Sequence, residues 1–255
     1  MGGYNDLELE GWRELDINVE SLWLIGERDK SGKHKNIYHG NFIPQIPNQL
    51  IRRYTKVGDT VFEPFMGSGT TAIECEKLGR SYIGFDINPQ MISYVKAMEL
   101  QNNPTIKNAD SQDPASFDFL GDKKFQFALL HPPYWDIVKF TDKKEDLSNC
   151  TELKEFVDRF IIVCKNFIPH LDKNRYFAVV IGDVYKNSEV IPLGFYLMHH
   201  IKLNFKVKLK GIIVKNIEGN RGKIGQNNIW RYRALKNDYF IFKHEYILVF
   251  KKEFR

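Results

Sequence analysis

The stretch VFEPFMGSGTTAIECEKLGRSYIGFD, residues 61–86, decides the fold class of this chain. A short apolar segment leads into Gly67-Ser68-Gly69, a helix-like run extends from Thr70 to Leu78, and a second apolar segment ends on Asp86. A strand, a glycine turn, a helix and a strand closed by a carboxylate form the first half of a nucleotide-binding βαβ unit. Taken alone, the same pattern is also compatible with a tight turn that binds no ligand.

Each part of this unit suits a nucleotide for a physical reason. Glycines let the backbone approach a ligand where a Cβ would collide, and the amino terminus of the helix offers unpaired N–H groups. The carboxylate of Asp86 can accept two hydrogen bonds from a ribose diol.

Further strand-like segments alternate with helix-like runs along the rest of the chain. The apolar segments lie at 105–107, 125–130, 176–181, 207–214 and 246–250, and the helix-like runs at 48–54, 89–98, 151–167 and 191–203. This alternation predicts an α/β fold with a doubly wound, mostly parallel sheet. We expect residues 1–255 to form a single domain, with residues 1–35 as an N-terminal extension or loop.

Composition narrows the function classes. No run of about 18 apolar residues is present, which argues against a membrane span, and the acidic start of the chain is unlike a secretory signal. The three cysteines cannot build a disulfide framework and lack the close pairing of a zinc site, so no metal is expected. A reducing cytoplasm is the expected location.

Positive charge is concentrated towards the carboxy-terminal end. The whole chain carries a net charge of +5, yet residues 202–243 hold eleven Lys or Arg and only two acids. This asymmetry predicts contact with a polyanion, above all nucleic acid. A solvated strand face that contains Lys206, Lys208 and Lys210 is the alternative interpretation.

A second group of residues, His131-Pro132-Pro133-Tyr134, directly follows the buried segment 125–130. Open α/β sheets bind their ligands at the carboxyl ends of strands, so we expect this tetrapeptide to lie at the ligand site. Two consecutive prolines fix the backbone and remove two N–H donors, which leaves the nearby carbonyl groups free to accept hydrogen bonds. With Tyr134 as a stacking surface, the tetrapeptide suits a planar substrate that carries an amino group.

The two groups together resemble the S-adenosylmethionine-dependent DNA amino methyltransferases, which make N6-methyladenine or N4-methylcytosine. Residues 63–71, EPFMGSGTT, are similar to the family's DPFxGSGTT motif, and residues 131–134 resemble its catalytic (D/N/S)PP(Y/F/W) motif. The resemblance implies a seven-stranded, Rossmann-like methyltransferase sheet in the unpermuted motif order. It also implies that S-adenosylmethionine is the cofactor, bound by Phe42, Glu63, Phe65, Gly67, Gly69, Thr70, Asp86 and Asp110.

Target recognition has to follow Tyr134, because about twenty residues between Asp110 and His131 are too few for a recognition domain. The candidates are the segment 137–148 and a small basic insertion at 215–240. DNA phosphates are expected to meet the basic side chains in and beside that insertion, namely Lys215, Arg221, Lys223, Arg231 and Arg233.

Two residues depart from the family pattern. Glu63 replaces Asp at the position that usually meets the cofactor's amino group, and one added methylene should be tolerated there. His131 replaces Asp, Asn or Ser, and only its neutral form can accept a hydrogen bond from a target amino group. If this side chain does that work, activity should fall as the histidine becomes protonated.

The predicted function is site-specific methylation of double-stranded DNA on the amino group of a flipped base, with N6 of adenine slightly favoured over N4 of cytosine. The expected catalytic residues are His131, Pro132, Pro133 and Tyr134. The alternatives are methylation of RNA amino groups, or a DNA-recognition subunit that has lost catalysis through His131. The resemblance further implies a cognate restriction endonuclease as partner, a monomer or homodimer, and nucleoid association through DNA.

Overall fold

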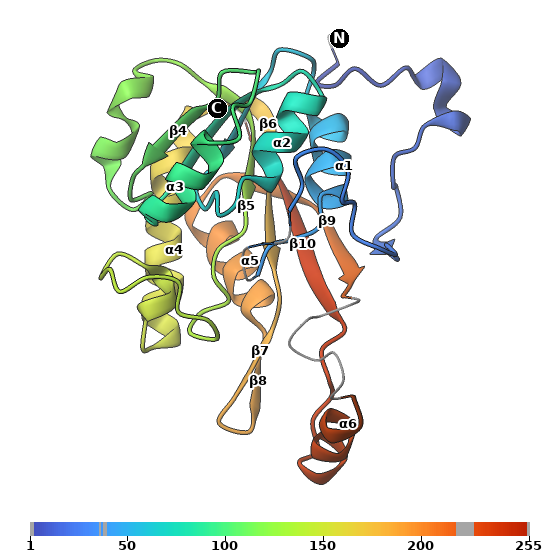
Figure 1. Cartoon of the computed structure of the whole chain (residues 1–255), viewed down its shortest axis with the longest axis vertical. Coiled ribbons are helices and arrows are strands. Elements are labelled where there is room, and N and C mark those ends of the chain that lie inside the picture. Colours follow the sequence, from blue (N-terminus) through green and yellow to red (C-terminus); the bar gives the residue numbers. More distant parts are fainter. Residues whose placement is uncertain (1–2, 36, 38–39, 218–226, 254–255) are drawn as a thin grey trace.

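The computed structural model of this protein describes residues 3–35, 37, 40–217 and 227–253. Within them, helices cover both faces of one large sheet (Figure 1). Its strand order is β1-β9-β10-β6-β5-β2-β3-β4. The bounds of these strands are β1 (Leu22–Trp23), β2 (Thr60–Glu63), β3 (Ser81–Asp86), β4 (Thr105–Asn108), β5 (Phe125–Leu130), β6 (Leu171–Ile181), β9 (Val207–Asn216) and β10 (His244–Lys252).

The sheet is mostly parallel, as the alternation of elements predicts. Only β10 runs antiparallel, to both of its neighbours β6 and β9, within the described part of the chain. All seven expected strands are present, so the doubly wound α/β fold is confirmed. The two-residue β1 adds an eighth strand at the β9 edge, from a segment that was expected to be a loop.

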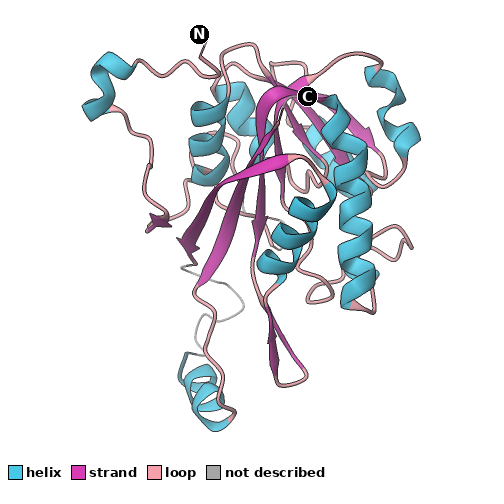
Figure 2. Ribbon diagram, turned by 180° about the vertical axis from the view of Figure 1, so that it is seen from behind, coloured by secondary structure: helices cyan, strands magenta, loops and turns pink. Residues whose placement is uncertain are grey.

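The helices are divided between the two faces. α1 (Gln45–Tyr54), α2 (Thr70–Lys77) and α3 (Pro89–Lys96) cover one face, while α4 (Leu153–Phe167) and α5 (Leu193–Asn204) cover the other (Figures 1 and 2). Side chains alternate along a strand, so Val61 enters the core under α1–α3 and Phe62 enters the core under α4 and α5. Both faces are therefore buried, which explains why the strands are apolar runs in the sequence.

Short elements complete the chain, and two helix boundaries differ from those expected. The 3-10 helices are η1 (Leu9–Glu14), η2 (Pro114–Leu120), η3 (Leu147–Asn149) and η4 (Ile168–His170). A hairpin of β7 (Val184–Lys186) and β8 (Glu189–Ile191) was not predicted, and Ile191 belongs to it instead of opening α5. The residue that caps α4 is Glu152, one position after the expected Thr151.

Two parts project beyond the same end of the sheet: the β7–β8 hairpin and α6 (Asn227–Lys236) (Figure 1). The rings of Tyr185 and Tyr239 lie 4.8 Å apart and connect the hairpin with the segment after α6. Both projections lie in the region that follows the tetrapeptide in the chain. They therefore extend the surface available to a large ligand.

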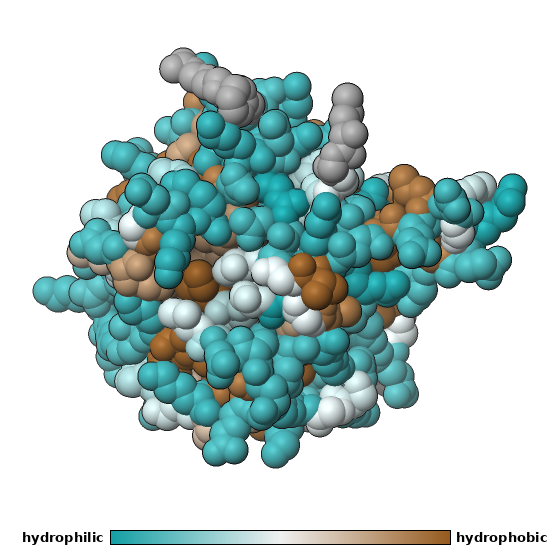
Figure 3. Space-filling model, turned by 90° about the horizontal axis from the view of Figure 1, so that it is seen from above, coloured by the Kyte–Doolittle hydropathy of each residue, from teal (hydrophilic) through white to brown (hydrophobic). Residues whose placement is uncertain are grey.

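The part of the N-terminal segment around η1 stands away from the body of the protein (Figure 1). Seen from above, it projects at one side and mixes hydrophobic with hydrophilic residues (Figure 3). Leu9 and Trp12 on η1 are 70% and 60% exposed. Among the described helices, none is both long and apolar enough to cross a membrane.

Candidate active site

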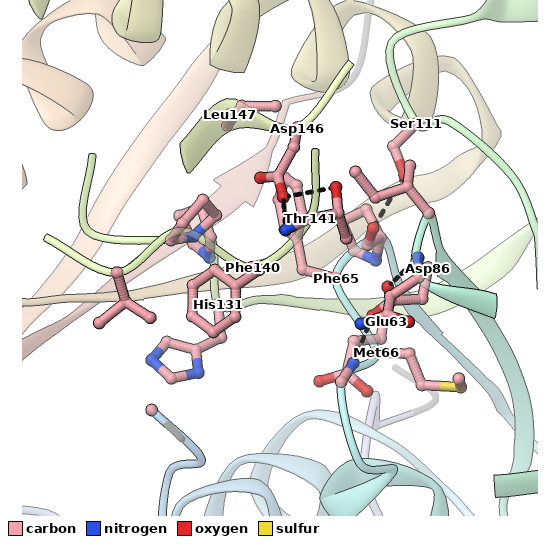
Figure 4. A pocket seen from close by; sticks show the side chains of 18 of the residues that line it. Glu63, Phe65, Met66, Asp86, Ser111, His131, Phe140, Thr141, Asp146 and Leu147 are labelled. Atoms are coloured by element: carbon pink, nitrogen blue, oxygen red, sulfur yellow. Dashed lines mark hydrogen bonds between the residues drawn. The ribbon is translucent and has the colours of Figure 1, made fainter. Parts of the chain in front are cut away.

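A cavity opens at the carboxyl ends of β2, β3, β4 and β5, and it encloses about 1090 Å³ of space including its open mouth. Its walls come from segments that are far apart in the sequence, mainly 40–42, 63–67, 86–88, 110–111, 131–134 and 137–147. Figure 4 shows His131 on one side of the cavity and Glu63 and Asp86 on the other. The glycine turn and the tetrapeptide therefore face one common space.

The predicted site residues are brought together with one exception. The cavity is lined by all four residues of the tetrapeptide and by seven of the eight predicted cofactor residues, Phe42, Glu63, Phe65, Gly67, Thr70, Asp86 and Asp110. Gly69 does not line it, because this residue caps the amino end of α2 behind the turn. What each residue binds stays a prediction.

The turn between β2 and α2 requires glycine for conformation and for space. Gly67 and Gly69 have φ angles of +52° and +77°, a region that strongly favours glycine. A Cβ on Gly69 would lie 2.9 Å from Cγ2 of Val95 in α3. The turn therefore packs tightly against α3. This contact holds the backbone N–H groups of the turn at the edge of the cavity.

We expect Gly69→Ala to destabilise the protein by about 2–4 kcal/mol, because it adds a collision with Val95 to the cost of a positive φ. Gly58→Ala is the matched control, since Gly58 has a φ of +83° and nothing within 4 Å of its Cβ position. Gly58→Ala should cost about 1 kcal/mol. Urea unfolding measures both free energies, and equal losses would exclude the contact with Val95 as a source of the effect.

Asp86 is held by the backbone on both sides of its carboxylate. Oδ2 accepts a hydrogen bond of 2.7 Å from the N–H of Gly67, and Oδ1 accepts one of 2.8 Å from the N–H of Asn88. Burial raises the pKa of Asp86, and these two donors act in the opposite direction. Each oxygen keeps lone pairs for a further donor, so the carboxylate is prepared to bind a diol.

Glu63 is almost completely buried at the end of β2. Its Oε1 accepts a hydrogen bond of 2.8 Å from the Thr71 hydroxyl, and its Oε2 accepts one of 2.5 Å from the Tyr82 hydroxyl. Burial raises the pKa of Glu63 to about 8. Gly84 makes the Tyr82 contact feasible, because a Cβ there would lie 2.6 Å from the Tyr82 hydroxyl. Glu63 is therefore mostly uncharged at neutral pH in the structure as it stands.

The segment before α1 is joined to the glycine turn by Asn41, a residue that the sequence did not single out. Its amide Nδ2 donates a hydrogen bond of 2.5 Å to the Ser68 hydroxyl, and its Oδ1 accepts one of 3.2 Å from the Thr70 hydroxyl. This places the ring of Phe42 against that of His131, with ring centroids 4.8 Å apart. Phe42 thus lines the cavity beside His131 of the tetrapeptide.

His131 is neutral at any physiological pH. Burial lowers the pKa of His131 to about 3, since a charged imidazolium is poorly solvated between Phe42 and Tyr134. The expected loss of activity on protonation therefore moves to about pH 3. Nε2 of His131 lies 3.2 Å from the Tyr134 hydroxyl, and Nδ1 has no hydrogen bond to any residue that the structure describes.

The segment 137–148 walls the cavity opposite the turn. Asp146 is buried and organises this segment, because its two oxygens accept hydrogen bonds from the N–H and hydroxyl groups of Thr141 and Ser148. Figure 4 shows Thr141, Asp146 and the nearby Phe140 along this wall. A segment predicted for target recognition is therefore also part of the cavity.

The basic residues predicted to meet phosphates have different surroundings. The prediction that Lys215 meets a phosphate is wrong. Lys215 is only 5% exposed in β9, and its Nζ lies 3.3 Å from Glu245 Oε1. Arg231 and Arg233 are exposed on α6, where they are accessible to a ligand. Arg221 and Lys223 lie outside the described residues.

One cluster with metal-binding side chains occurs among the described residues, away from the cavity. Ligand atoms of Asp29, His34 and Glu74 lie within 4.8 Å of one another. The Lys77 ammonium is 3.0 Å from Glu74 Oε1 and 3.5 Å from Asp29 Oδ2. Asp29 and His34 of the N-terminal segment thus contact Lys77 and Glu74 of α2, so the cluster connects this segment to α2.

Comparison with known proteins agrees with this geometry. Residues 3–97 match the DNA methylase family. This match covers less than half of the chain. Type II methyltransferase M.MjaII of Methanocaldococcus jannaschii is 41% identical over 68 residues, which cover 26% of this chain and 13% of the relative. Type II methyltransferase M.MvaI of Kocuria varians is 24% identical over 156 residues, which cover 58% of this chain and 34% of the relative.

The chain thus spans about a third or less of the length of these two relatives. Among solved structures, TrmN from Thermus thermophilus superposes with a TM-score of 0.56 and 16% identity, over 84% of this chain and 50% of TrmN. At this identity the likeness concerns the fold alone.

Sequence reasoning missed Glu245 of β10 as part of the site. Its Oε2 accepts a hydrogen bond of 2.9 Å from the Tyr134 hydroxyl, although 111 residues separate the two. A signal was present in the sequence, since Glu245 is the one acidic residue of the final strand and directly precedes its apolar run.

Proposed function

We propose that this protein transfers a methyl group from S-adenosylmethionine to the exocyclic amino group of a base in double-stranded DNA, with N6 of adenine ahead of N4 of cytosine. The observation that carries the proposal is the common cavity of the glycine turn and the tetrapeptide 131–134. The family match and the names of the relatives support DNA as the substrate.

The cofactor side of the cavity fits a nucleoside with a positively charged sulfonium. Asp86 offers a fixed carboxylate for the ribose hydroxyls, Glu63 lies where the amino group would be received, and Asp110 lines the end of the cavity assigned to the adenine. The neutral His131 adds no repulsion towards a cation. S-adenosylmethionine, when bound, supplies an electrophilic methyl group.

The target side of the cavity orients the accepting amino group. The base is flipped from the duplex, its ring stacks on Tyr134, and its amino group donates hydrogen bonds to His131 and to the Pro132 carbonyl. These acceptors draw the nitrogen lone pair out of conjugation and towards the methyl group. The nitrogen would form the new N–C bond as the methyl–sulfur bond breaks and the neutral thioether, S-adenosylhomocysteine, leaves. The nitrogen then releases one proton to water, and most of the acceleration comes from positioning.

No covalent intermediate with the chain is required. The three cysteines, Cys75, Cys150 and Cys164, are buried and do not line the cavity. Burial raises the pKa of each thiol, which keeps it protonated and poorly nucleophilic.

Binding of duplex DNA is assigned to the segment 137–148 and to the region 215–240. Of the basic residues predicted to meet phosphates, Arg231 and Arg233 are the ones that the structure describes as exposed. Each phosphate contact should make the affinity fall more steeply with salt.

The test is transfer of a labelled methyl group from S-adenosylmethionine to duplex DNA and, in parallel, to tRNA. Transfer to DNA, mapped by single-molecule sequencing of DNA from expressing cells, supports the proposal and gives the base and the site. Transfer to tRNA alone would replace it with an RNA methyltransferase. Cofactor binding with no transfer to any DNA would favour a recognition subunit.

A further inference from the structure

Four polar side chains form a continuous chain from the cavity into the sheet. His131 and Tyr134 follow β5, Glu245 lies on β10, and Lys215 lies on β9. The contacts are His131 Nε2 to Tyr134 hydroxyl at 3.2 Å, Tyr134 hydroxyl to Glu245 Oε2 at 2.9 Å, and Glu245 Oε1 to Lys215 Nζ at 3.3 Å. Lys215 and Glu245 sit directly opposite each other in the antiparallel register of β9 and β10.

The direction of the hydrogen bonds in this chain is decided by its acidic end. A carboxylate paired with a lysine can only accept, so the single hydroxyl proton of Tyr134 goes to Glu245. The Tyr134 oxygen can then only accept from His131. Nε2 of His131 must therefore carry the ring proton, and Nδ1 of the neutral ring must be an acceptor.

Burial keeps Tyr134 and His131 in the protonation states that this logic needs. Burial raises the pKa of the Tyr134 hydroxyl, which remains protonated, and the low pKa of His131 keeps its ring neutral. The ring of Tyr134 also packs directly against the backbone of Gly182. A Cβ at Gly182 would lie 2.7 Å from the Tyr134 Cε2 atom, so only glycine leaves room for the ring there. A buried ion pair contributes little to stability compared with apolar side chains, so its presence beside the cavity calls for another explanation.

We propose that Glu245, held by Lys215, is a positioning residue that acts through the Tyr134 hydroxyl to fix His131 as the Nε2–H tautomer. This tautomer leaves Nδ1 as the acceptor for the amino group of the target base. The inference rests on the proposed function for its purpose, but the tautomer itself is a property of the protein alone. It also gives His131 a defined acceptor atom, as an Asn or Asp side chain would have.

The tautomer can be read directly from the side-chain ¹⁵N chemical shifts of labelled histidines, with His131→Asn to assign the signal. We expect the Nε2–H form in the unaltered protein. In Glu245→Gln, Lys215 attracts the new carbonyl oxygen, so the amide NH₂ faces Tyr134 and the hydroxyl proton turns to His131. The tautomer should then invert to Nδ1–H.

Two further variants complete the measurement. Tyr134→Phe removes the hydroxyl and should leave a mixture of both tautomers. Tyr246→Phe is the matched control, because it also removes a tyrosine hydroxyl that contacts a histidine. The Tyr246 hydroxyl lies 3.0 Å from Nε2 of His244 on the same strand, so its loss should not affect His131. Circular dichroism confirms that each variant is folded, and Tyr134→Phe remains informative if Glu245→Gln does not fold.

Turnover gives an independent readout. Glu245→Gln should lower kcat about tenfold, the scale of one hydrogen bond, without changing the Kd of S-adenosylmethionine. In a His131→Asn background the same substitution should cost much less, because asparagine has no tautomer to lose. An Nδ1–H signal in the unaltered protein, or an unchanged signal in Glu245→Gln, would overturn the inference. The expected tautomers without any methyl transfer would instead refute the proposed function.

Discussion

Replacement of Tyr134 by alanine is expected to lower methyl transfer about a hundredfold, while the affinity for S-adenosylmethionine stays close to that of the unaltered protein. In the proposed function Tyr134 is the stacking surface for the target base, and base–aromatic stacking contributes about 1–3 kcal/mol. The substitution also removes the hydroxyl that contacts His131. The base then loses its orientation, and small displacements of the reactants cost about a hundredfold in rate.

The measurement separates turnover from cofactor binding. Single-turnover transfer to duplex DNA gives the rate, and titration calorimetry gives the Kd of S-adenosylmethionine. Tyr94→Ala on α3 is the matched control, because this tyrosine packs in the core outside the cavity. A folded Tyr134→Ala protein that no longer binds the cofactor would contradict the assignment of Tyr134 to the target side.

Binding of S-adenosylmethionine at pH 7 is expected to release close to one proton from Glu63. With its pKa raised to about 8 by burial, Glu63 is mostly protonated before binding. The positive amino group of the cofactor favours the carboxylate and lowers this pKa, so the proton leaves. Above about pH 9 the release should fade, because Glu63 is then already ionised in the free protein.

Calorimetry in buffers of different ionisation enthalpy counts the released protons. Glu63→Gln keeps the size of the side chain and the two hydroxyl neighbours but has no proton to release. The difference between the two proteins isolates Glu63 from any change at the cofactor's own amino group. Equal proton release from both would show that Glu63 does not meet the amino group.

Local pattern was sufficient to predict the sheet and the place of the cavity. The strands at 60–63 and 125–130 are apolar because both faces of the sheet are covered, and the carboxyl ends of parallel strands necessarily meet at one edge. Asp86 at the end of β3 and His131 directly after β5 could therefore be placed together in advance. The short β1 and the β7–β8 hairpin have too few residues to give a pattern.

Long-range register was not available from the sequence, and the wrong interpretation of Lys215 follows from that. In isolation Lys215 belongs to a run of basic residues, and only the pairing of β9 with β10 shows that Glu245 neutralises it. The same register places Glu245 beside Tyr134. The low pKa of His131 likewise depends on burial between Phe42 and Tyr134, which no local pattern reports.

The position of β10 has a consequence for the order in which the protein is made. This strand follows all other strands of the sheet in the chain, yet it lies between β6 and β9. While the ribosome has not yet released it, both neighbours carry an unpaired edge that can capture other strands. Glu245 arrives with this strand, so a nascent chain can form the glycine turn well before Tyr134 and His131 are held in place.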